Sequence, residues 1–131
     1  MHYTNTKFYQ KIKSSLSNCN GIFEKMINAK SPEEILILLD LCHFKKEDLN
    51  HLFLILLGEA ILEVHHDDRL LEILIDLAEN HETFDSVFKT KSFWNLCGMW
   101  IRKNYTKKDK TRFQKLSILM GIGGRKANYR N

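Results

Sequence analysis

Proline, long hydrophobic runs and, in the last quarter, acidic residues are all scarce in this chain of 131 residues. The longest apolar run is Leu52–Leu57, far short of the roughly 18 residues that a membrane-spanning helix needs. The first residues lack the apolar stretch and cleavage site of a signal peptide. The cysteines, Cys19, Cys42 and Cys97, are too widely spaced for a disulfide framework and predict buried or free thiols. Together these absences predict an intracellular protein, nuclear or cytoplasmic, without membrane contact.

Motifs for catalysis and metal binding are also missing. The sequence has no GxSxG and no phosphate-cradling GxxxxGK[ST]. It has no C-x₂-C or HExxH spacing, the patterns that place two zinc ligands on one element. The densest group of possible ligands, residues 65–68, lies in a polar break between helices, where adjacent histidines usually face water or cap helix ends. We therefore expect no enzyme activity, no cofactor, no metal and no small-molecule substrate.

What the chain does have is helical periodicity almost throughout, without sustained period-two alternation. The clearest local signal is Ser31-Pro32-Glu33-Glu34, a capping box with proline at the first helical position. The helix after it is apolar on nearly every side, which predicts a central place in the packing. We expect an all-α fold of six to eight helices, with these residues buried: Leu38, Leu41, Leu52, Phe53, Leu56, Leu70, Leu74, Leu77, Phe93 and Trp100.

An internal similarity is visible at a spacing of 36 residues, where Ile35–Cys42 (ILILLDLC) aligns with Leu71–Ala78 (LEILIDLA). The stretch Leu70–Ile101 resembles an armadillo- or HEAT-type repeat, with a Leu-rich helix, a short second helix and a long third one. That resemblance implies a non-enzymatic surface for peptides, proteins or nucleic acid. A plain helical bundle has the same pattern, so the sequence leaves a bundle and a short repeat-like stack both open.

The domain organisation is simple. The length suits one compact domain, which we expect to comprise residues 1–120. Gly121, Gly123 and Gly124 predict that the last helix stops there, and residues 121–131 are expected to form a basic tail.

Charge is distributed very unevenly along the chain. Residues 1–100 carry 10 bases and 15 acids, a net −5, and residues 101–131 carry 10 bases and one acid, a net +9, which sum to the overall +4. Fourteen of the acids lie between residues 31 and 88. Such a separation indicates that the basic region meets a polyanion or an acidic partner.

Nucleic acid, with RNA favoured, is the partner we expect for this basic region. Lysines at the start of a helix oppose its dipole, so helix stability does not explain them. Contacts between these lysines and phosphates would be favourable, because each contact releases counterions. Tyrosines among the bases could stack on unpaired nucleotides. The candidate binding residues are Arg102, Lys103, Lys107, Lys108, Lys110, Arg112, Lys115, Arg125, Lys126, Arg130, Tyr105 and Tyr129. The lysines and arginines of the helix are expected to be exposed.

A protein–protein adaptor is the alternative, with the basic segment serving as an address or docking on the acidic region of another copy. Trp94 and Met99 lie on a different side of their helix from Phe93 and Trp100. One of these pairs could therefore form a partner surface, and we take Trp94 and Met99 as the candidates. Another protein is an expected partner under both hypotheses.

Overall fold

The computed structural model describes residues 21–62, 68–104 and 110–128. Within these ranges the chain forms six α-helices and one 3₁₀ helix, and no strand. The expected all-α fold is therefore confirmed. In chain order the elements are α2 (Ile22–Ile27), α3 (Pro32–Cys42), α4 (Lys46–Leu62), α5 (Asp68–Asn80), η3 (Asp85–Lys89), α6 (Lys91–Asn104) and α7 (Lys110–Asn128).

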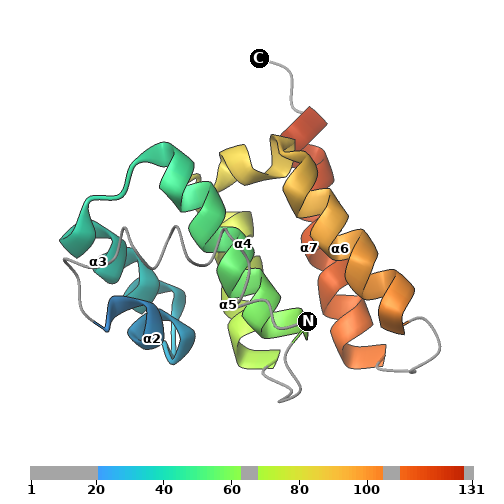
Figure 1. The fold of residues 1–131 in the computed structure, drawn as a ribbon, viewed down its shortest axis with the longest axis horizontal. Coiled ribbons are helices and arrows are strands. Elements are labelled where there is room, and N and C mark those ends of the chain that lie inside the picture. Colours follow the sequence, from blue (N-terminus) through green and yellow to red (C-terminus); the bar gives the residue numbers. More distant parts are fainter. Residues whose placement is uncertain (1–20, 63–67, 105–109, 129–131) are drawn as a thin grey trace.

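The helices pack around α4 and α5, which run antiparallel to each other (Figure 1). Helix α7 lies along α5 and runs in the same direction, while α6 packs on α4 and returns antiparallel beside α7. The short helices α2 and α3 form the opposite end of the molecule. This arrangement places the acidic helix α5 directly against the basic helix α7.

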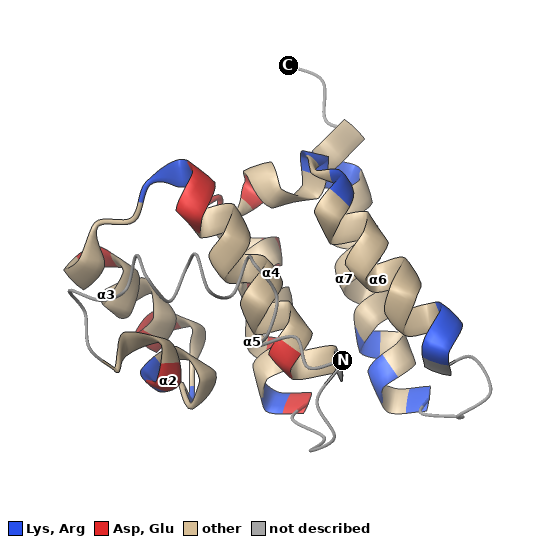
Figure 2. Ribbon diagram, in the orientation of Figure 1, with Lys and Arg blue, Asp and Glu red and all other residues tan. Residues whose placement is uncertain are grey.

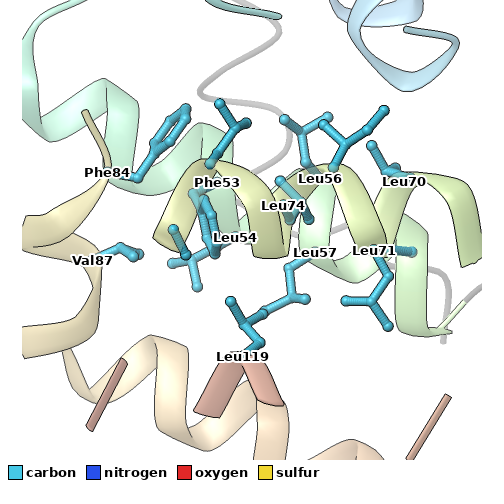
Figure 3. Packing of buried hydrophobic residues seen from close by; sticks show 14 of the residues in the cluster. Phe53, Leu54, Leu56, Leu57, Leu70, Leu71, Leu74, Phe84, Val87 and Leu119 are labelled. Atoms are coloured by element: carbon cyan, nitrogen blue, oxygen red, sulfur yellow. The ribbon is translucent and has the colours of Figure 1, made fainter. Parts of the chain in front are cut away.

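Helix α4 occupies the centre because its apolar run has neighbours on every side. All six residues of Leu52–Leu57 are buried, and α4 contacts α2, α5, η3 and α6. Figure 3 shows side chains of α4 and α5 meeting Phe84, Val87 and, from α7, Leu119 in one continuous core. The aromatic part of this core is built on Phe53, whose ring centroid lies 5.2 Å from that of Phe84 and 5.8 Å from that of Phe88.

Helix α3 is peripheral, so the expectation that it is central was wrong. It packs mainly against α2 and α5, and only its Ile35 and Leu39 are buried. Leu38 is half-buried and Leu41 is 67% exposed, against the prediction that both are buried. The other eight predicted core residues are buried. Apolar periodicity cannot tell how many sides of a helix will find neighbours, and α3 finds too few.

The predicted start of α3 is confirmed in detail. Ser31 has extended backbone, and its Oγ accepts a hydrogen bond from the Glu34 amide at 3.4 Å. The Glu34 carboxylate reaches back to accept from the Lys30 amide at 3.0 Å. Pro32 holds the first helical position, where no amide hydrogen is needed.

Arg69, which the sequence analysis did not single out, connects α5 to the end of α2. The Arg69 guanidinium, on α5, donates hydrogen bonds to the carbonyls of Ile27 and Ala29, at and just beyond the end of α2. A cation at this position complements the partial negative charge at the end of a helix. Arg69 thus fixes α2 on the central helix pair.

The glycines near the C-terminus do not end the last helix. Helix α7 continues through Gly121, Gly123 and Gly124 to Asn128, so the expected helix stop was wrong and residues 121–128 are helical. Gly123 lies against the buried ring of Phe88. A Cβ at this position would come within 2.7 Å of Cδ1 of that ring. Burial of Leu119 and Ile122 on the same helix offsets the low helix propensity of glycine.

Two of these glycines should respond oppositely to alanine. Gly123→Ala should lower the free energy of unfolding by about 1–3 kcal/mol, because the buried Phe88 ring must move. Gly121→Ala should raise it by up to about 1 kcal/mol, since its Cβ would meet nothing within 4 Å and alanine favours the helix. Urea denaturation of both variants measures the difference. Equal shifts would contradict the close packing at Gly123.

Candidate functional site

The ten basic residues proposed as a binding site fall into three groups. Four of them lie against acidic residues of this same chain, and three others, Arg102, Lys103 and Lys110, are exposed. Lys107, Lys108 and Arg130 lie outside the described residues, as do Tyr105 and Tyr129. The structure therefore divides a set that the sequence presents as uniform.

Helices α5 and α7 are joined by ion pairs along their length. Nζ of Lys115 lies 2.7 Å from Oε1 of Glu72, and Nη2 of Arg125 lies 3.3 Å from Oε1 of Glu79. Because both helices run in the same direction, acids seven residues apart on α5 meet bases ten residues apart on α7. Two acids of α5, Glu72 and Glu79, thus face the basic helix α7.

A further pair closes the far end of α7. Nζ of Lys126 lies 2.7 Å from Oδ1 of Asp85 and donates to the His81 carbonyl at 3.0 Å. These residues, with Arg125 and the end of α5, line a shallow hollow of about 440 Å³. Its lining carries three acids, Glu79, Glu82 and Asp85, against the two bases Arg125 and Lys126, so its formal net charge of −1 does not favour a phosphate.

Arg112 is the clearest departure from expectation. The sequence predicts an exposed phosphate contact. In the structure Arg112 lies on the buried side of α7 and is only 4% exposed. Its Nη1 donates to the Ile61 carbonyl at 3.3 Å, and its Nε lies 4.0 Å from Oδ1 of Asp68. The expected exposure of Arg112 was therefore wrong, and this side chain belongs to the packing between α4, α5 and α7.

The other three described bases of the proposed binding set lie at one end of the molecule. Arg102 and Lys103 occupy the last turn of α6, and Lys110 is the first residue of α7. These two helix ends lie near each other (Figure 2). None of the three forms an ion pair with another described residue. We call Arg102, Lys103 and Lys110 the basic end.

Local stability explains only part of the basic end. Cations in the last turn of α6 complement the helix dipole, so Arg102 and Lys103 stabilise the helix as well as being exposed. Lys110 stands at a helix start, where a positive charge is unfavourable. Its position has no explanation in the packing of the described residues.

The two candidate partner-binding residues differ in their surroundings. Nε1 of Trp94 donates to the Phe88 carbonyl at 2.8 Å, and its ring packs edge-on against Phe93 with centroids 4.8 Å apart. Trp94 is half-buried and therefore has a structural role in the α6–η3 contact. Met99 is exposed on the same helix. Two other exposed apolar surfaces, on α3 and on α7, were not anticipated.

The cysteines supply no activated thiol in the described part of the chain. Burial raises the pKa of the Cys97 thiol to about 12, so it stays protonated at neutral pH. Cys42 is half-buried and disulfide-bonded. The expectation of buried or free thiols is thus wrong for Cys42. Cysteine usage consequently gives no support to a reducing compartment.

The described residues hold neither a candidate metal site nor a candidate membrane span. Residues 21–62, 68–104 and 110–128 contain no group of three potential metal ligands. Among these described residues, no helix is both long and apolar enough to cross a membrane. The polar break at residues 65–67 lies outside the described part.

Comparison with known proteins gives no match. No protein family matches the chain, and no curated protein or solved structure is significantly similar to it. The resemblance to armadillo and HEAT repeats stays a prediction.

Proposed function

We propose that this protein is a non-enzymatic helical module that binds nucleic acid at its basic end, as an accessory subunit of a larger intracellular complex. One observation carries the proposal. Arg102, Lys103 and Lys110 are exposed at one end without an acidic partner among the described residues. Three adjacent uncompensated cations suit a phosphate backbone, because each contact releases a condensed counterion.

The sequence of the α6–α7 connection supports the same location. Lys107 and Lys108 lie between the two helix ends in the chain, so up to five cations belong to this region. Tyr105 lies in the same connection and offers a ring for stacking. Stacking requires unpaired bases, which is why RNA or another single strand is favoured over a duplex.

Bases that are engaged in the fold should contribute little. Lys115, Arg125 and Lys126 already face carboxylates of α5 and η3. With about five phosphate contacts, the logarithm of affinity for single strands should fall against the logarithm of salt with a slope of about −3.5. Ten contacts would give about −7. The salt slope therefore measures how many of the bases are used.

A matched pair of arginine reversals tests the proposal. Arg102→Glu should weaken binding to single-stranded RNA about tenfold at 0.1 M salt and flatten the slope by about one unit, because a phosphate contact is lost. Arg125→Glu makes the same charge change at an exposed arginine that faces Glu79, and should change affinity much less. Fluorescence anisotropy at several salt concentrations gives both quantities. Equal losses in the two variants, or no binding at low salt, would overturn the proposal.

A protein adaptor is the second candidate function, and one observation favours it. Ile37 and Leu41 are 59% and 67% exposed on the outer side of α3, where they offer an apolar contact surface. Under this function the basic end would be an address only. An adaptor without nucleic-acid contact predicts that RNA does not bind, even at low salt.

A further inference from the structure

Phe113 is an aromatic residue that the fold leaves in solvent. Its side chain is 48% exposed on α7, and it belongs neither to the hydrophobic core nor to the residues packed against that core. The buried side of the same helix carries Arg112 and Leu116, so helical periodicity turns Phe113 outward. Among the described residues its ring has no aromatic partner, whereas the rings of Phe88 and Phe93 pack on each other. The packing of the chain therefore does not explain an aromatic side chain here.

The ring of Phe113 lies beside the basic end. Lys110 precedes it by three residues on α7, which is about 4.5 Å along the helix axis and on the same side of the helix. Both side chains are exposed. Arg102 and Lys103 complete the basic end from the last turn of α6, which ends near the start of α7 (Figure 2). An exposed ring and three exposed cations thus share one end of the molecule.

This combination matches the chemistry of single-stranded nucleic acid. A single exposed apolar residue is ordinary on a protein surface. The second observation, that the three cations have no acidic partner among the described residues, selects a polyanion. Cations hold the phosphates of a single strand, and an aromatic face stacks on an unpaired base of any identity. A duplex offers the same phosphates but keeps its bases stacked inside, where a ring on a helix surface does not reach them.

We propose that Phe113 stacks on an unpaired base, so that this end of the molecule prefers single-stranded nucleic acid to a duplex. The inference rests on the proposed function, because the basic end must first hold the phosphates. It adds a residue to that site and a selectivity that charge alone does not supply. The opposite side of α7 is packed into the core, so the backbone of Phe113 is fixed before a strand binds. A fixed backbone lowers the entropy lost on binding.

Fluorescence anisotropy with three probes tests the inference on the full chain. The probes are a single-stranded RNA, a duplex of the same sequence and a DNA strand of the same length that lacks bases. Phe113→Leu removes the ring but keeps an apolar side chain, and should weaken binding to the single-stranded RNA about tenfold. Its affinity for the duplex and the base-free strand, and its salt slope, should not change, because no cation is lost. Phe113→Tyr keeps the ring and should bind like the wild type.

Ile118→Ala is the matched control. Ile118 is a 54% exposed apolar residue on the same helix, but it follows Lys110 by eight residues, about 12 Å along the axis. This variant should bind all three probes like the wild type. Because Phe113 and Ile118 are both exposed, the melting temperatures of the three variants should stay close to that of the wild type.

Arg102→Glu distinguishes a failure of this inference from a failure of the proposed function. It should weaken binding to the RNA and to the base-free strand alike, since it removes a phosphate contact. If Arg102→Glu did so while Phe113→Leu bound the RNA like the wild type, stacking by Phe113 would be overturned and the proposed function would stand. Equal losses of Phe113→Leu on the RNA and the base-free strand, or a Phe113→Tyr protein as weak as Phe113→Leu, would also overturn it. A wild-type protein that binds none of the probes at low salt would overturn both.

Discussion

Replacing Arg112 by glutamate is expected to destabilise the protein by about 3–5 kcal/mol, the effect of leaving a buried charge without its partners. The guanidinium is 4% exposed, donates to the Ile61 carbonyl and lies near Asp68. A carboxylate there would repel Asp68 and could not donate to the carbonyl. Urea denaturation followed by circular dichroism measures the loss.

Lys110→Glu is the matched control for this prediction. It reverses a charge on the same helix, two residues earlier, but at an exposed position. Its free energy of unfolding should stay the same or rise by up to about 1 kcal/mol, because a carboxylate suits a helix start. If Arg112→Glu proved as stable as Lys110→Glu, the burial of Arg112 between α4, α5 and α7 would be contradicted.

Replacing Leu74 by alanine should cost about 2–5 kcal/mol, from lost burial and the cavity left behind. Leu74 is fully buried on α5, between α4 and the rest of the core (Figure 3). The same denaturation experiment measures it. A Leu74→Ala protein with wild-type stability would show that the packing of α5 is not as described.

Leu41→Ala makes the same chemical change at a leucine that sequence periodicity also predicts to be buried. At 67% exposure it should lose no more than about 0.5 kcal/mol. The two leucines thus separate what periodicity predicts from what packing decides. If both variants lost a similar amount of unfolding free energy, the exposed position of Leu41 on α3 would be contradicted.

Several features of this fold follow from sequence because their causes are local. The capping box at Ser31 requires only residues within one turn of each other, and the structure has it. The run Leu52–Leu57 is too apolar to leave in water anywhere, and it is buried. Helical periodicity likewise depends on neighbours three and four residues apart, and the described chain is all α.

The candidate site depended instead on contacts between distant segments. Lys115 and Glu72 are 43 residues apart, and Arg125 and Glu79 are 46 apart, so no local pattern reveals that they pair. The sequence determined by itself that one region is basic, another acidic, and both helical. Only the tertiary structure decided that four bases of α7 lie against acidic residues of α5 and η3. It also decided that the glycines of α7 are helical and that α3 lies at the edge of the core. The physical reason is that these outcomes depend on which helix faces meet, which is fixed by the packing of the whole core.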